Sequence, residues 1–362
     1  MRRVRGARRG ASLGRICFFP LPLARVWGKP KVVVVGGGQC GALVTGAKGT
    51  TVLYYASMLE LNTYWQSVFP NRPIPSAILT HFSAPSGTEK KDQEKEHYWT
   101  INSDQLTKRD AKIFHNWAHR VTSEKLLYPE SAFTTGSKIN LYIDRAAALH
   151  STFLHRDVAD SIPMSTENFT DIATMSSPVS VSMARDMWST LSSCEHPREV
   201  VGEQKACATS LESMHKFVAS ALGTSSIHGF STSLDVPEEG IASPLDIYKV
   251  VAVRAITAYG ASKEASNTVT CHSMSFPFAL FYCHAVNPTR IYEVTLKVEN
   301  GVVSATQRMS PVVRALVVCH VNTSGFDPKL NYWVKLGLKP GQASVCHFLT
   351  RGDVLWTPAL VA

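Results

Sequence analysis

Long apolar runs are missing from this 362-residue sequence: no stretch approaches 18 consecutive apolar residues, so we expect no transmembrane helix. Acidic residues are missing from positions 1–31, which carry nine Lys and Arg. The rest of the chain holds 28 basic and 28 acidic side chains, so the net charge of +9 belongs to this short stretch. A neutral body argues against a dedicated nucleic-acid-binding protein, and we predict no specific nucleic-acid partner.

A clean secretory signal is also missing. The best apolar segment near the start, residues 16–23, contains Pro20 and Pro22 and is soon followed by Arg25, whereas a signal peptide needs an apolar region of roughly 7–15 residues. An Arg-rich, acid-free start also fits an organelle transit peptide or an upstream translation start that is not used. We therefore interpret residues 1–56 as a leader, a targeting segment or a wrongly assigned start.

One motif inside this leader resembles a dinucleotide-binding motif. Residues 31–35 are apolar, and Gly36–Gly41 then follows the G-x-G-x-x-G spacing of dinucleotide-binding proteins. A helix would have to begin at these glycines, but Gly46 and Gly49 interrupt it. We therefore predict a Gly-rich leader and no dinucleotide cofactor.

Two further segments follow the leader. Residues 57–125 hold a short apolar helix, stopped by the prolines from Pro70 to Pro75, and then a polar linker. His115 and His119 in the linker have no third ligand nearby, so we assign them no metal. Residues 126–360 form the predicted folded domain.

The domain is predicted to be α+β, with a β-rich C-terminal half and at least one capped helix. Thr209-x-x-Glu212 has the spacing of a capping box, and an apolar stripe then runs to Gly223. After that helix, strands are predicted at 292–299 (followed by an Asn300-Gly301 turn), at 312–321 and at 345–349.

Four adjacent Cys-His pairs, here called doublets, lie within 77 residues and are separated by 10, 34 and 25 residues: Cys271-His272, Cys283-His284, Cys319-His320 and Cys346-His347. In a β-strand, neighbouring side chains point to opposite faces. If each doublet lies on a strand, the four Cys can share one face and the four His the other. The first face then suits disulfides, and the second suits a cluster of imidazoles.

Six cysteines belong to the domain: Cys194, Cys207, Cys271, Cys283, Cys319 and Cys346. An even number fits disulfides in an oxidising compartment, although the sequence does not choose among the 15 pairings that six cysteines allow. The alternative is a Cys/His zinc site or reduced thiols in an intracellular protein. Zinc ligands are usually spaced roughly two to five residues apart, so adjacent pairs suit one tetrahedral ion poorly. We favour a disulfide-stapled domain.

The four doublet histidines are a candidate metal site. Imidazole suits Cu(II), Ni(II) and Zn(II), and a tetragonal set of nitrogen ligands favours copper. The sequence therefore predicts copper as the candidate cofactor, or else no cofactor and a structural role for the four rings.

The spacing CH-x10-CH, with two further doublets, resembles the plant BURP domain. The residues around the doublets resemble that family too, in the segments Phe276–Tyr282, Asn322–Ser324, Lys339–Gly341 and Asp353–Trp356. The likeness covers roughly residues 126–360. The chain departs from the family in its second spacer, whose 34 residues are more than usual, and we expect the surplus between Gly301 and Ala315.

This resemblance implies a secreted plant protein of the cell wall, apoplast or vacuole, acting in development or stress response, with cell-wall components as candidate partners. Some family members are copper-dependent peptide cyclases whose doublet histidines bind the metal, which implies His272, His284, His320 and His347 as ligands here. Cyclases that modify themselves carry repeated substrate segments, but residues 1–125 contain no internal repeat. The favoured prediction is a non-catalytic protein. The alternative is an oxidative cyclase that cross-links Tyr or Trp side chains of a peptide on another chain.

Two smaller motifs complete the sequence. Asn168 and Asn322 begin N-x-Ser/Thr sequons and are glycosylation candidates if the chain is secreted, although Asn322 follows the third doublet closely. Arg351-Gly352-Asp353 matches an adhesion tripeptide of animal proteins. We predict that it forms a turn between two strands.

Overall fold

The computed structural model shows two five-stranded antiparallel sheets with helices packed around them, which confirms the predicted α+β class. The structure describes residues 30–33, 43–46, 55–82, 100–101, 127–146, 151–176, 179–195, 202–241, 247–256, 265–299 and 312–359. Sheet I contains, in spatial order, β6 (Gln204–Ala208), β10 (Phe281–Ala285), β9 (Val269–Ser273), β14 (Val354–Pro358) and β7 (Ile227–Ser231). Sheet II contains β13 (Val345–Phe348), β12 (Val312–His320), β11 (Thr289–Val298), β8 (Ile247–Ile256) and β4 (Lys138–Asn140).

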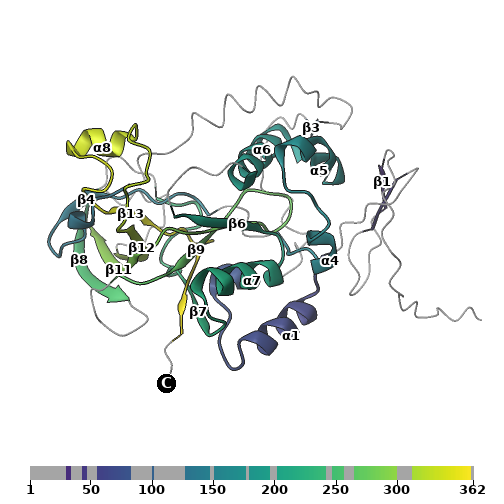
Figure 1. Cartoon of the computed structure of the whole chain (residues 1–362), viewed down its shortest axis with the longest axis horizontal. Coiled ribbons are helices and arrows are strands. Elements are labelled where there is room, and N and C mark those ends of the chain that lie inside the picture. The colour runs from purple at the N-terminus through teal and green to yellow at the C-terminus, as the bar shows by residue number, and fades with distance from the viewer. Residues whose placement is uncertain are drawn as a thin grey trace, which may run out of the picture.

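Among the helices described, α1, α4, α5, α6 and α7 lie at the sheet I end of the molecule, and α8 lies at the sheet II end (Figure 1). Their bounds are α1 Met58–Val68, α2 Ser76–Leu79, α4 Arg156–Ala159, α5 Phe169–Met175, α6 Val181–Glu195, α7 Leu211–Leu222 and α8 Asn331–Leu336, with 3₁₀ turns η4 Glu130–Ala132 and η5 Thr166–Asn168. None of the helices described is long and apolar enough to cross a membrane.

The structure also contains two antiparallel pairs of short strands: β1 (Pro30–Val33) with β2 (Leu43–Gly46), and β3 (Thr100–Ile101) with β5 (Val179–Ser180). The Leu43–Gly46 segment is therefore a strand where the dinucleotide-binding motif would require a helix. The charge run of the linker, His115 and His119 lie outside the described residues.

Each sheet has its own core, and a third cluster joins the two sheets. One face of sheet I packs on α1, α2 and α7, and one face of sheet II packs on residues near the start of the domain. The other faces meet through a small cluster drawn from β11, β12 and β14 and the chain after β13: Ile291, Leu316, Val318, Leu349 and Leu355. The sheets are therefore held together on the faces opposite their main cores.

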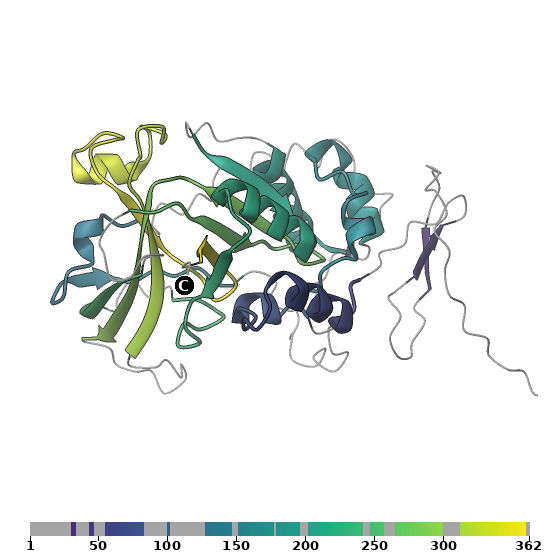
Figure 2. The same cartoon turned by 60° about the horizontal axis from the view of Figure 1, so that its bottom comes forward.

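The segment before the domain belongs to the core of sheet I. Ser57 and Glu60 form a capping box at the start of α1, as the side chain of each accepts from the backbone N–H of the other. Trp65 is 2% exposed, donates its indole N–H to the Arg72 carbonyl at 2.9 Å, and packs against Trp356 of β14. Figures 1 and 2 show α1 (purple) lying beside α7. The sequence predicted the helix before the prolines but neither α2 nor this packing.

The strands and the C-terminal end of α7 agree with the sequence. Regions 292–299, 312–321 and 345–349 correspond to β11, β12 and β13, and the Asn300-Gly301 turn lies outside the described residues. Gly223 ends α7 in the left-handed conformation. The predicted cap was wrong by one residue, because Ser210 is the N-cap and exchanges hydrogen bonds with Ser213 instead.

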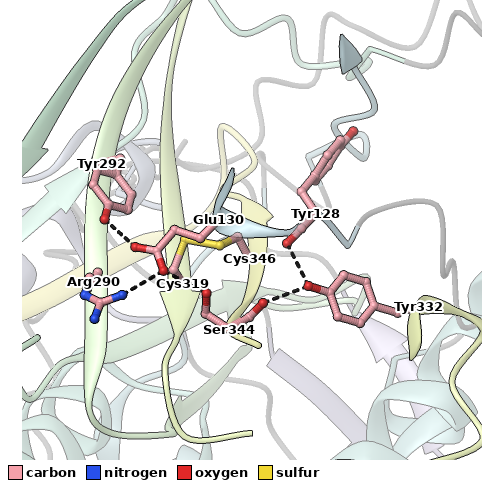
Figure 3. Close-up of a disulfide and its surroundings, with 8 residues drawn as sticks. All are labelled: Tyr128, Glu130, Arg290, Tyr292, Cys319, Tyr332, Ser344 and Cys346. Carbon is pink, nitrogen blue, oxygen red and sulfur yellow. Dashed lines mark hydrogen bonds and ion pairs between the residues drawn. A yellow bond between two sulfur atoms is a disulfide. The ribbon is translucent and has the colours of Figure 1, made fainter. Parts of the chain in front are cut away.

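Next to the Cys319–Cys346 disulfide, Glu130 connects the start of the domain to sheet II through hydrogen bonds (Figure 3). Its carboxylate accepts hydrogen bonds from Arg290 Nη1 at 2.7 Å, from Ser344 Oγ at 2.7 Å and from the Tyr292 hydroxyl. Burial alone would raise the pKa of the Glu130 carboxyl, but the hydrogen bonds of Tyr292 and Ser344 and the charge of Arg290 lower it overall. Ionised Glu130 therefore links η4, β11 and the residue before β13.

Replacing Trp65 tests whether α1 belongs to the cooperative core. We expect Trp65→Ala to lower the free energy of unfolding by about 3–5 kcal/mol, because it empties a buried aromatic site. Leu59→Ala on the same helix is the matched control, since Leu59 is 72% exposed and surface changes usually stay within about 0.5 kcal/mol. Urea denaturation gives both values, and equal small effects would show that α1 is peripheral.

Replacing Glu130 tests the pH dependence of its network. The folded-state pKa lies below the unfolded value of about 4.3, so the ionised group stabilises the fold above that pH. This contribution is lost as pH falls through the folded-state pKa. We expect the stability difference between wild type and Glu130→Gln, measured by urea denaturation, to be largest at neutral pH and to shrink at acid pH. Glu293→Gln, which breaks an exposed pair with Arg254, should show little difference at any pH. A Glu130→Gln effect that is constant with pH would contradict this account.

Candidate metal centre

Three disulfides use the six cysteines that the sequence predicted. Cys194–Cys207 joins α6 to β6 with a Cα–Cα distance of 5.6 Å. Cys271–Cys283 joins β9 to β10, and Cys319–Cys346 joins β12 to β13, at 3.9 and 4.0 Å. In both of these pairs the cysteines lie directly opposite one another in antiparallel register. Within the described part of the chain, no cysteine thiol is left for the alternative Cys-based zinc site.

The four doublet histidines form a closed ring where the sheets meet. Each follows its cysteine by one residue, so its side chain leaves the opposite face of the strand. The ring centroids are separated by 5.3 Å for His272–His284, 5.6 Å for His284–His320, 5.5 Å for His320–His347 and 5.4 Å for His347–His272. Sheet I supplies the first and second doublets and sheet II the third and fourth, so the ring exists only while the sheets are packed together.

Carboxylates back the two histidines of sheet I. Nδ1 of His272 lies 3.3 Å from Asp353 Oδ2, and Nδ1 of His284 lies 3.1 Å from Glu203 Oε1. Asp353 directly precedes β14 and Glu203 directly precedes β6, the strands on either side of the β9–β10 pair. These contacts place a proton on Nδ1, which fixes the tautomer and the orientation of each ring.

Backbone carbonyls play the same part for the two histidines of sheet II. Nδ1 of His320 lies 3.2 Å from the Val286 oxygen, and Nδ1 of His347 lies 3.3 Å from the Phe348 oxygen. In all four rings Nδ1 therefore faces an acceptor, and Nε2 is the nitrogen that could bind a metal.

Three histidines of the ring, His284, His320 and His347, are held in the neutral form. Burial, followed by the proximity of the other imidazoles, lowers the pKa of His320 and of His347 to about 3 and that of His284 well below its usual value. The Glu203–His284 contact is therefore a hydrogen bond from a neutral ring. Neutral imidazole is the form that binds a metal ion, so protons compete weakly for this site at neutral pH.

The spacing of the nitrogens fits a single ion. One ligand nitrogen from each of His272, His284 and His347 can be chosen so that all three lie within 4.8 Å of one another, and the Nε2 atoms of His272 and His284 are 3.2 Å apart. Metal–nitrogen bonds of about 2 Å place neighbouring ligands about 3 Å apart, so small side-chain movements suffice. His320 closes the ring through its contacts with His284 and His347. His272, His284 and His347 therefore offer an all-nitrogen site to a transition metal, and His320 lies beside it.

Neither carboxylate was predicted from the sequence to belong to the site. Asp353 belongs to the Arg351-Gly352-Asp353 tripeptide, which forms the predicted turn, but its side chain is buried against His272 and is not available for adhesion. Glu203 was one acid among many. They could have been identified from their positions directly before β14 and β6, the strands that flank the β9–β10 pair. This requires knowing the order of the strands in the sheet.

The asparagines of the two sequons differ in their exposure to solvent. Asn168 is partly buried at the start of α5 and donates to Ser165 Oγ at 2.6 Å. Asn322 is exposed, and its side-chain oxygen accepts from the backbone and hydroxyl of Ser324 at 3.2 and 2.7 Å. Glycosylation at both sites stays a prediction.

Comparison with known proteins places these features in a family. Residues 126–358 match the BURP domain. BURP domain-containing protein 11 of Oryza sativa subsp. japonica is 37% identical over 247 residues, covering 63% of this chain and 73% of the relative. BURP domain-containing protein 2 of the same species is 32% identical over 320 residues, covering 87% and 96%. BURP domain protein RD22 of Arabidopsis thaliana is 33% identical over 242 residues, covering 66% and 57%.

The matched range, residues 126–358, contains the residues of all four doublets, of the three disulfides and of both carboxylates behind the ring. It spans more than half of the sequence, and the predicted resemblance is confirmed. This chain belongs to the BURP domain family of plant proteins.

Proposed function

We propose that this chain is a secreted BURP domain protein whose four-histidine ring binds one Cu(II) ion. The observation that carries the proposal is the arrangement of the rings: every Nδ1 faces an acceptor oxygen, and the rings form a closed set with centroids 5.3–5.6 Å apart. Structural histidines need no such convergence, whereas metal ligands are commonly held through their second nitrogen in this way.

Copper is favoured over other divalent metals by the donor set. Four neutral imidazoles suit a tetragonal nitrogen site, and Cu(II) binds such ligands most tightly among the first-row divalent ions. His272, His284, His320 and His347 would hold the ion. Bound Cu(II) would supply one-electron oxidation, while the protein orients the rings and buries that of His320.

Secretion is supported by the three disulfides, because such bonds persist in oxidising compartments and are rare in the cytosol. The cell wall, the apoplast and the vacuole are the compartments implied by the family resemblance. Cell-wall components are the candidate partners there, with a role in development or stress response. The absence of repeated substrate segments in residues 1–125 favours a non-catalytic role.

A copper-dependent oxidative peptide cyclase is the second candidate. The observation in its favour is that the ring is open on one side, since the side chain of His272 is 25% exposed. A Tyr or Trp side chain of a separate peptide could approach there. In this case the chain's own residues would orient the copper and admit the peptide, and the substrate would come from another protein.

Loss of ring histidines tests copper binding. We expect the purified, disulfide-bonded protein to retain one Cu(II) per chain after gel filtration. His284→Ala and His347→Ala should each weaken binding by more than about 100-fold, since even the loss of a residue behind a ligand typically costs about 10–100-fold. Metal analysis and chelator competition measure this, and electron paramagnetic resonance reports nitrogen ligands.

The matched control is His155→Ala, because His155 is the N-cap residue of α4 and lies outside the ring. It should leave copper binding unchanged. A metal-free wild type that stays so in excess Cu(II) would refute the proposal. Mass spectrometry of a co-expressed Tyr- and Trp-containing peptide then decides the second candidate, since a cross-link formed only with wild type and copper would identify a cyclase.

A further inference from the structure

The negative charge around the ring is uneven. The side chains of Asp353 and Glu203 behind the sheet I histidines are only 2% and 8% exposed. The sheet II histidines have neutral carbonyl oxygens in the same positions. Both buried charges therefore lie on one half of the site.

Several contacts fix these carboxylates in place. Asp353 accepts from the backbone N–H of Thr350 at 2.7 Å and of Ser273 at 3.3 Å. Glu203 also accepts from the Tyr282 hydroxyl at 3.5 Å. The carboxylates are thus part of the framework, and their charges stay at a fixed distance from whatever the ring holds.

Fixed charges act differently on the two oxidation states of copper. Neutral imidazoles do not offset the charge of an ion, whereas a carboxylate attracts a divalent ion with twice the energy of a monovalent ion at the same distance. Burial reduces the screening of this attraction by salt. We infer that Asp353 and Glu203 make the ring favour the divalent over the monovalent state of its metal. The inference rests on the proposed copper binding and adds to it the residues that set its redox preference.

One nearby cation acts in the opposite direction. Lys205 of β6 lies directly opposite His284 of β10, and its ammonium donates to the Ser193 carbonyl at 2.9 Å and lies 5.6 Å from the centre of the Tyr282 ring. Removing this positive charge should increase the preference for the divalent ion. Substitutions of the acids and of the lysine should therefore move the same quantity in opposite directions, which general damage to the site would not do.

The test compares wild type with Asp353→Asn, Glu203→Gln and Lys205→Gln. Chelator competition gives the dissociation constants for Cu(II) and Cu(I), and a spectroscopic redox titration gives the reduction potential. We expect each acid substitution to lower the ratio of Cu(II) to Cu(I) affinity by about tenfold, which raises the potential by about 59 mV. Lys205→Gln should lower the potential.

Redox-inert ions give an independent measurement. Zn(II) represents the divalent state and Ag(I) the monovalent state, so the acid substitutions should weaken Zn(II) binding more than Ag(I) binding. Asn and Gln keep the size of the two acids that they replace, and circular dichroism checks that each variant is folded. If Asp353→Asn does not fold, Glu203→Gln carries the test alone.

The outcomes separate the two proposals. Equal loss of affinity for both oxidation states, with an unchanged potential, would mean that the carboxylates only position the rings and would overturn the inference. A shift of Lys205→Gln in the same direction as the acid variants would overturn it as well. If the wild type bound neither copper ion, the proposed function itself would be wrong, and this inference with it.

Discussion

The register of two antiparallel strand pairs decides where every side chain of the candidate site lies. Cys271 is directly opposite Cys283, and Cys319 is directly opposite Cys346. Because each histidine follows its cysteine, this register places the imidazoles diagonally across each pair, on the face away from the disulfides. A shift by one residue would turn both sets of side chains over. The disulfides therefore fix the strand register on which the positions of the imidazoles depend, although they lie on the opposite face of each strand pair.

The contact between the two sheets is the second requirement. Neither sheet carries more than two of the four histidines, so the ring depends on the apolar cluster formed by residues such as Leu316 of β12 and Leu355 of β14. His320 links the sheets directly, since its Nδ1 faces the carbonyl of Val286, the residue after β10. A site whose histidines come from both sheets forms only when the whole domain is folded, because one sheet alone supplies only two of the four. The burial that keeps His284, His320 and His347 neutral is a consequence of the same contact.

Local signals in the sequence predicted local structure well. The doublets predicted opposite faces for Cys and His because alternation along a strand is a property of the backbone alone. Gly223 marked the end of α7 for the same kind of reason. Asp353 and Glu203 were not identified, since they reach the ring only through the strand order β6-β10-β9-β14. This order brings each acid next to a histidine 81 residues away along the chain. The packing of Trp65 on Trp356 was hidden in the same way, because each residue alone is an ordinary apolar residue.

The long second spacer shows why strand pairing, and not chain length, places the third doublet. β12 pairs with β11 from its first residue, where Val312 lies opposite Lys297, to its last, where His320 lies opposite Thr289. Residues added between the two strands would join them at the end remote from His320, and lengthening a connection costs little free energy, about 0.6 kcal/mol for each doubling. On its other side His320 lies opposite Val345 of β13, which fixes it relative to the fourth doublet. The predicted surplus between Gly301 and Ala315 falls mostly outside the described residues, and insertions there would leave the position of His320 in the sheet unchanged.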